Sequence, residues 1–129
     1  MNIRKVTPAH HDARGTISDV LEDETIEHVS IITSASGAVR GNHYHKLTSQ
    51  WLYILEGRLK VATREPNGEV RTATVEMGDV VSTGPMEEHA TVALEPTTML
   101  VLTRGPRGGR DYETDTYRLE TPILTEDAS

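Results

Sequence analysis

Apolar residues recur at every second position along most of the chain, and this alternation constrains the fold more than any other feature. Side chains of a strand alternate between its two faces, whereas an amphipathic helix repeats every 3.6 residues. Val, Ile and Thr, which favour strands, dominate the apolar clusters. We therefore predict strands at about 16–21, 28–34, 38–45, 50–55, 58–65, 69–76, 79–83, 89–94 and 97–104, and no long helix.

Turn-forming residues separate these segments. The clearest example is Pro66-Asn67-Gly68, which lies between two alternating runs and is typical of a hairpin turn. Short strands at a spacing of about ten residues are typical of a β-sandwich or β-barrel. Because 129 residues correspond to one domain, we predict a barrel domain over residues 1–123 and a flexible, polar C-terminal tail over residues 124–129.

The charge balance argues against two classes of partner. Thirteen Lys and Arg against 20 Asp and Glu give a formal net charge of -7, which repels phosphate backbones and anionic membrane surfaces. No apolar run approaches the roughly 20 residues of a membrane helix, and the first residues lack the apolar segment of a signal peptide. We expect a cytoplasmic protein that binds neither nucleic acid nor membranes.

The chain has no cysteine, so any metal must be held by histidine, carboxylate or amide groups. His43 and His45 flank Tyr44 on one predicted strand. Alternation places both imidazoles on the same face, roughly 6.5–7 Å apart along the backbone. A third histidine, His89, begins a later strand. Surface or edge positions are expected for the other three, His10, His11 and His28.

The histidine pair belongs to a motif of glycine, histidine and glutamine at fixed spacing. The motif consists of Gly41, His43, His45, Gln50 and Gly57. A second motif follows with Gly78, Gly84-Pro85 and His89. In this pattern the chain resembles the cupin superfamily over about residues 37–104, most closely in the first motif. The resemblance implies an all-β, single-domain, double-stranded β-helix, also called a jelly-roll barrel, with its pocket around these histidines. Gln50 occupies the place of the carboxylate ligand in metal-binding cupins.

The string Arg40-Gly41-Asn42-His43-Tyr44-His45-Lys46 carries a narrower resemblance. It is similar to a segment of dTDP-4-dehydrorhamnose 3,5-epimerases and of dTDP-4-keto-6-deoxyglucose 3,4-ketoisomerases. The ketoisomerases also have glutamine at the place of Gln50, a Gly-Pro turn before a histidine, and an acidic, tyrosine-containing stretch like residues 111–118. These families work without metal. The resemblance implies that His43 is the base and that His45 hydrogen-bonds the sugar or shuttles the proton.

Isomerising a keto sugar requires a base near neutral pH and donors for the enolate oxygen, and imidazole suits the first task. We expect catalytic roles for His43, His45 and Arg40, with Gln50 binding substrate. A nucleotide-linked substrate also carries a pyrophosphate. Arg107 and Arg110 lie among glycines, which allow the backbone to approach a ligand closely. The planar guanidinium group of arginine can donate two hydrogen bonds to the oxygens of one phosphate. We expect these two arginines to bind substrate, although a solvated loop is the simpler interpretation of the segment.

The sequence thus predicts a cupin enzyme that isomerises or epimerises a nucleotide-linked keto sugar by histidine-mediated proton transfer, without a cofactor. One alternative is a metal-dependent cupin, such as a dioxygenase, isomerase or lyase, with Fe, Mn, Ni or Zn held by His43, His45, Gln50 and His89. The neutral amide of Gln50 is a weaker ligand than a carboxylate and argues against it. A further alternative is a non-catalytic module that binds a small molecule.

Two aromatic side chains bear on assembly. Trp51 and Tyr53 alternate with Gln50, so they point outward if Gln50 points into the barrel. Outward aromatics on a strand commonly cover a second layer or a subunit interface. We therefore expect a homodimer.

Overall fold

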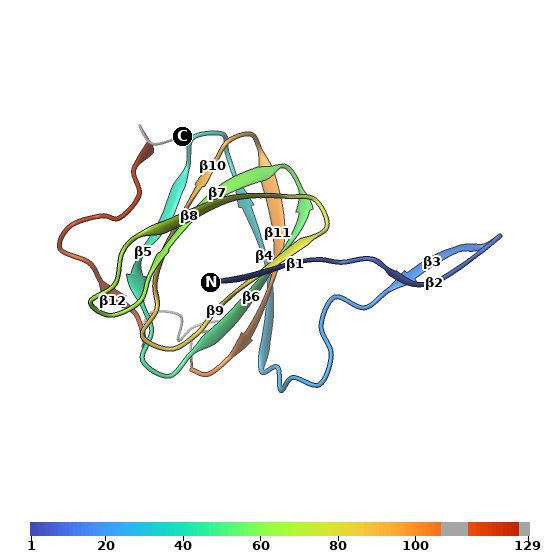
Figure 1. Cartoon of the computed structure of the whole chain (residues 1–129), viewed down its shortest axis with the longest axis horizontal. Coiled ribbons are helices and arrows are strands. Elements are labelled where there is room, and N and C mark those ends of the chain that lie inside the picture. Colours follow the sequence, from blue (N-terminus) through green and yellow to red (C-terminus); the bar gives the residue numbers. More distant parts are fainter. Residues whose placement is uncertain (107–113, 127–129) are drawn as a thin grey trace.

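The computed structural model describes residues 1–106 and 114–126 and is built from β-strands, with no α-helix in those ranges. Two five-stranded antiparallel sheets face each other, as Figure 1 shows. None of the described residues forms a helix that could cross a membrane. The predicted all-β, single-domain jelly-roll class is confirmed.

The strands of the first sheet are, in order, β1 (Asn2–Lys5), β9 (Asp79–Thr83), β6 (Ser49–Glu56), β11 (Thr97–Arg104) and β4 (His28–Ser34). Those of the second are β12 (Tyr117–Arg118), β5 (Val39–Tyr44), β10 (Glu88–Ala93), β7 (Arg58–Arg64) and β8 (Arg71–Glu76). A separate hairpin comprises β2 (Pro8–Asp12) and β3 (Gly15–Ser18).

The predicted strands from residue 28 to residue 104 agree with β4 to β11 to within a few residues at each end. The strands β1, β2 and β12 were not predicted from the sequence. These strands lack the apolar alternation on which the prediction depends, and all four residues of β1 are exposed. The predicted boundary between barrel and tail after residue 123 stays a prediction. Leu124 falls within the predicted flexible tail, but it is 4% exposed and packs with Ala62, Ala90 and Val92.

The core between the two sheets is aliphatic, because the chain has no phenylalanine. Alternate residues of β6, β7, β9 and β11 point inward and pack with Val75 of β8. The largest cluster consists of Ile54, Leu59, Val61, Val75, Val81, Ala93, Met99 and Val101. Burying such side chains contributes about 1.5–3 kcal/mol each. This core occupies one part of the barrel interior, and the polar site described below occupies another.

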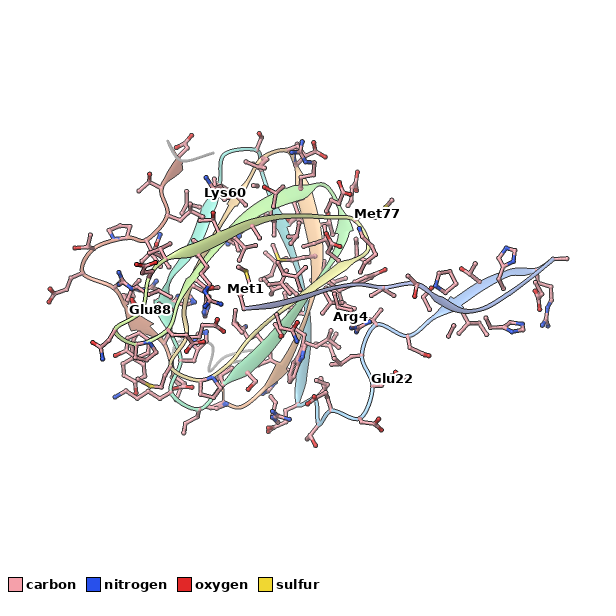
Figure 2. The ribbon with its side chains drawn as sticks, viewed as in Figure 1. Met1, Arg4, Glu22, Lys60, Met77 and Glu88 are labelled. Carbon is pink, nitrogen blue, oxygen red and sulfur yellow. The ribbon has the colours of Figure 1, made fainter. Side chains whose placement is uncertain are left out.

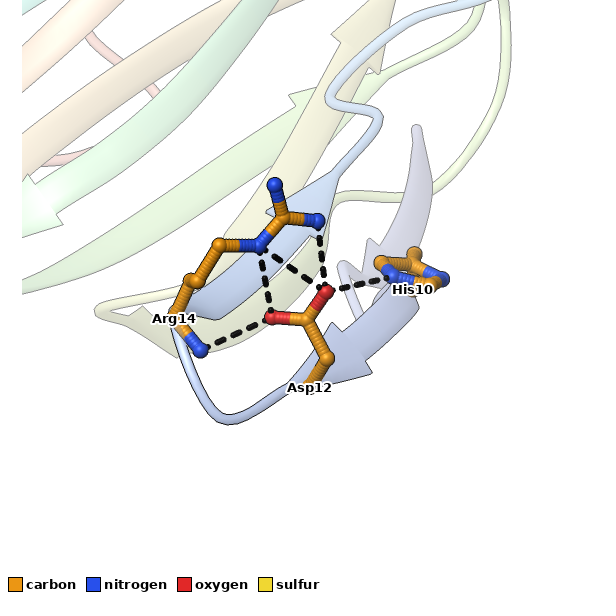
Figure 3. Close-up of polar contacts among 3 residues, drawn as sticks. All are labelled: His10, Asp12 and Arg14. Atoms are coloured by element: carbon orange, nitrogen blue, oxygen red, sulfur yellow. Dashed lines mark hydrogen bonds and ion pairs between the residues drawn. The ribbon is translucent and has the colours of Figure 1, made fainter.

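The β2–β3 hairpin projects away from the two sheets, as Figures 1 and 2 show. At its turn the Asp12 carboxylate accepts hydrogen bonds from the Arg14 guanidinium at 2.7 Å and the Arg14 backbone N–H at 2.8 Å (Figure 3). The His10 ring lies 3.1 Å from the same carboxylate. The Arg14 side chain is the main reason why the pKa of Asp12 falls to about 2. The exposed turn is therefore held by a fully ionised carboxylate.

Candidate active site

The three histidines singled out in the sequence lie together inside the barrel. His43 is on β5, His45 directly follows that strand, and His89 is opposite His43 on β10. The ring centroid of His43 lies 4.8 Å from that of His45 and 4.7 Å from that of His89. His43 and His45 are buried, and His89 is half-buried. Strand alternation and one cross-strand pair therefore create the triad.

A bulge in β5 positions the histidine pair. His89 pairs with His43, but the next residue, Ala90, pairs with Gly41, so Asn42 is an extra residue on β5. Gly41 and Asn42 both have positive φ, at 90° and 56°. A Cβ on Gly41 would lie 2.7 Å from the His89 carbonyl oxygen. Glycine is thus required where β5 and β10 approach most closely.

A cavity of about 320 Å³ opens beside the triad. Its apolar lining comes from Ile32, Val39, Leu52, Met99 and Val101, and its polar lining from Arg40, His43, Gln50, His89, Thr91 and Arg118. Gln50, which the sequence analysis expected to bind substrate, is 5% exposed and lies on β6 between Thr83 and Thr103. His45 is not among the lining residues and is 1% exposed. A substrate in the cavity would therefore meet His43 and His89, with His45 behind them.

Hydrogen bonds to carbonyl groups assign the tautomers of two of the imidazoles. His45 Nδ1 lies 2.7 Å from the Asp115 carbonyl oxygen, and His89 Nδ1 lies 3.1 Å from the Glu87 carbonyl oxygen. A carbonyl can only accept, so each Nδ1 must carry a proton. In the neutral ring the lone pair is then on Nε2. Both rings can accept a proton, or bind a metal, through Nε2.

The β9–β10 turn that presents His89 is held by Glu87, a residue that the sequence analysis did not single out. Its carboxylate is buried and accepts hydrogen bonds from the Gly84 N–H at 3.1 Å and from the Met1 amino group. The Met86 N–H donates to the His45 carbonyl oxygen. The turn that carries His89 is thereby tied directly to the end of the strand that carries His43.

Asp115 is a second residue that the sequence analysis missed. Its carboxylate is 3% exposed and accepts hydrogen bonds from the Lys46 N–H at 3.0 Å, the Leu47 N–H at 2.8 Å and the Thr48 hydroxyl at 2.8 Å. Burial would raise the pKa of Asp115, but these three donors together hold it below its usual range. The carboxylate is therefore ionised although it is buried.

The arginines differ in their relation to the cavity. Arg40 lines it, while its guanidinium also donates to the Ser34 hydroxyl and the Thr33 carbonyl of β4, both at 2.9 Å. Arg118, opposite His43 on β12, lines the cavity too and was not expected from the sequence. Arg107 and Arg110 lie outside the described residues.

Comparisons with known proteins bear on the family and the fold of the chain. A family model described as the polysaccharide biosynthesis C-terminal domain matches residues 10–117. No curated protein sequence matches the chain. Among solved structures, a double mutant of the QdtA 3,4-ketoisomerase from Thermoanaerobacterium thermosaccharolyticum in complex with TDP is 25% identical, with a TM-score of 0.71 over 92% of this chain and 86% of that one.

Two further structures are similar in fold. A dTDP-4-dehydrorhamnose 3,5-epimerase from Sulfolobus tokodaii is 17% identical, with a TM-score of 0.72 over 96% of this chain and 81% of that one. A 3,4-ketoisomerase from Helicobacter canadensis is also 17% identical, with a TM-score of 0.74 over 92% of this chain and 90% of that one. At this identity the likeness shows the fold alone.

Proposed function

Because the chain belongs to the polysaccharide biosynthesis C-terminal domain family, we propose that it is an enzyme that isomerises or epimerises a nucleotide-linked keto sugar by proton transfer. The observation that carries this proposal is the lining of one cavity by two imidazoles, an amide and two guanidinium groups. Imidazole can exchange a carbon-bound proton near neutral pH, and guanidinium suits phosphate oxygens. A ketoisomerase 25% identical to this chain holds TDP in its structure.

In the proposed reaction His43 removes the proton from the carbon beside the sugar carbonyl. The electron pair of the broken C–H bond forms an enolate, whose oxygen accepts hydrogen bonds from Arg40 or Gln50. Each such donor contributes about 3–4 kcal/mol of transition-state stabilisation in a dry pocket. Return of the proton to the former carbonyl carbon, with transfer of the hydroxyl proton of the first carbon to the enolate oxygen, gives the isomerised ketone. Return of the proton to the opposite face of the first carbon gives the epimer. Neither outcome is a net oxidation or reduction.

His45 and the arginines complete the proposal. His45 lies against His43 and His89 but does not line the cavity, which supports a proton-shuttle role over a direct hydrogen bond to the sugar. Arg40 and Arg118 supply positive charge for the diphosphate. Binding of the same diphosphate by Arg107 and Arg110 stays a prediction.

A metal-dependent reaction is the second candidate, and the histidine triad is the observation that favours it. The ligand atoms of His43, His45 and His89 lie within 4.8 Å of one another. Three nitrogens at roughly 2.1 Å from one tetrahedral ion lie about 3.4 Å apart, so a metal would require the rings to close by as much as ~1.4 Å. Three imidazole nitrogens therefore suit Zn, Fe, Mn or Ni chemically. Their separation of up to 4.8 Å is wider than the spacing that a tetrahedral ion requires.

Deuterium exchange combined with metal analysis tests these proposals. We expect protein purified without chelator to contain far less than one metal per chain by elemental mass spectrometry. We also expect it to introduce deuterium from D2O beside the carbonyl of TDP-4-keto-6-deoxyglucose, as followed by NMR. About one metal per chain, lost in His45→Ala, would place the metal-dependent reaction first. Binding of TDP without any exchange would indicate a binding module instead.

We further infer that two copies of the chain associate through the outer face of the β1-β9-β6-β11-β4 sheet. Val29 and Ile31 of β4 are 62% and 66% exposed on this face, and half-buried Trp51 and Tyr53 continue it on β6. Exposed apolar patches of this kind commonly mark interfaces.

The hairpin favours a second copy of the chain as the occupant of this face. β1 and β4 are the two edges of the sheet, and the chain between them carries β2 and β3. The hairpin projects away from its own sheets (Figure 1), and Ile17 on it is 60% exposed. An isolated two-stranded hairpin is marginally stable in water. Contact with a partner copy would cover both the hairpin and the sheet face.

Sedimentation velocity tests this assembly. We expect the wild type to sediment at twice the 14.2 kDa chain mass, because burying the β4 face removes Val29 and Ile31 from water. Ile31→Lys should shift the protein to monomer, because the interface would bury an unpaired charge. Val70→Lys, at an exposed apolar residue before β8 in the other sheet, serves as the control and should remain dimeric. A monomeric wild type at tens of micromolar would refute the inference.

A further inference from the structure

Residues 114–126 lie along the outer edge of β5, the strand that carries His43 and leads into His45. β12 pairs with β5 by setting Tyr117 opposite Tyr44, and the two tyrosine rings stack with centroids 5.3 Å apart. Farther on, the Asn42 side chain accepts from the Ile123 N–H at 2.9 Å and donates to the Leu124 carbonyl at 3.0 Å. β5 is therefore held between β10 on one side and residues 114–126 on the other.

Asp115 lies where this segment meets the turn between β5 and β6. All three donors to its carboxylate belong to that turn, at residues 46–48. Its own carbonyl oxygen accepts the Nδ1 proton of His45 at 2.7 Å. One residue thus anchors itself through its side chain and orients the buried imidazole through its backbone.

The consequence for His45 follows from the hydrogen-bond chemistry. With Nδ1 held by the carbonyl, the lone pair of the neutral ring is on Nε2, and the ring centroid lies 4.8 Å from that of His43 and 5.0 Å from that of His89. A free imidazole in water populates both tautomers. The carbonyl of Asp115 removes one of them, but only while the carboxylate keeps residue 115 against the turn.

We propose that Asp115 is a positioning residue, which fixes the Nδ1–H tautomer of His45 by anchoring residues 114–116 to the β5–β6 turn. The consequence for catalysis rests on the proposed function, because His45 is there the proton shuttle behind His43. Asp115 itself is not among the residues that line the cavity, so it acts through His45 and not on the substrate.

The tautomer is measured without any substrate, by nitrogen-15 NMR of the imidazole rings in chelator-treated protein above the histidine pKa. We expect His45 of the wild type to show a protonated Nδ1 and an unprotonated Nε2. In Asp115→Ala the two nitrogens should move toward averaged shifts, because the carbonyl is no longer held in place. Asp115→Asn should give an intermediate result, since an amide oxygen accepts but its NH2 opposes the backbone donors.

Thr48→Val is the matched variant, because it removes one of the three donors and keeps the carboxylate. It should retain most of the Nδ1–H tautomer. If Asp115→Ala does not fold, Asp115→Asn decides the question. If His45 keeps the wild-type pattern in folded Asp115→Ala or Asp115→Asn, the proposal is wrong.

Kinetics provide the second readout. We expect kcat for the keto sugar to fall about 10–100-fold in Asp115→Asn, the loss typical of mutating a residue that orients a metal-bound imidazole, with KM nearly unchanged. An equal loss through KM, with kcat preserved, would contradict the positioning role. If the wild type turns over no keto sugar, the proposed function fails, while the NMR experiment still tests the role of Asp115.

Discussion

His43→Asn should lower kcat for a nucleotide-linked keto sugar by about 10²–10⁴-fold, the usual contribution of a positioned general base. His43 lines the cavity, is 7% exposed, and touches both other imidazoles of the triad. Asparagine is close to histidine in size and polar, but it cannot take up a proton near neutral pH. The variant should therefore fold and bind TDP with an affinity within about threefold of the wild type, because the guanidinium groups are untouched.

The measurement is deuterium exchange at the carbon beside the carbonyl, followed together with TDP binding by calorimetry. His28→Asn is the matched control: it makes the same change on β4, at a residue that does not line the cavity, and it should leave exchange unchanged. Exchange at a rate near that of the wild type in His43→Asn would assign the base elsewhere, with His89 the remaining imidazole of the cavity.

The part of the site that sequence could predict is the part encoded by short-range regularity. His43 and His45 share a face because strand side chains alternate, and Gln50 follows after one turn. The same alternation predicted the strands from residue 28 to 104, because those strands are buried on one face. In β1 all residues are exposed, and in β2 all but Asp12, so no pattern of burial marks these two strands.

Residues that reach the site through long-range contacts could not be predicted. Asp115 is 67 to 70 positions away from its partners His45 to Thr48, and it stands among other acidic residues with no spacing to distinguish it. Arg118 reaches the cavity only because β12 pairs with β5. Arg40 shows the converse: its place beside His43 was predicted, but its hydrogen bonds to β4 were not, since they join strands of different sheets.

Gly41→Ala should destabilise the protein by about 2–6 kcal/mol, a large effect for a single methyl group. The left-handed backbone at φ 90° costs a non-glycine residue about 1–3 kcal/mol. The added Cβ would also lie 2.7 Å from the His89 carbonyl oxygen and 3.0 Å from Ala90 Cα, and such overpacking costs a further 1–3 kcal/mol or so. Both neighbours are backbone atoms of β10, so relief requires the two strands to separate.

That separation links stability to the site, because the pairing of β5 with β10 sets His43 opposite His89. We therefore expect Gly41→Ala to lower the midpoint of urea unfolding and, in the protein that remains folded, to lower kcat as well. Gly84→Ala is the control, since a Cβ there would meet nothing within 4 Å, although this glycine lies in the turn before His89. An unfolding midpoint of Gly41→Ala equal to that of Gly84→Ala would contradict this prediction. It would show that β5 and β10 can separate without loss of stability, and that their close approach does not hold His43 beside His89.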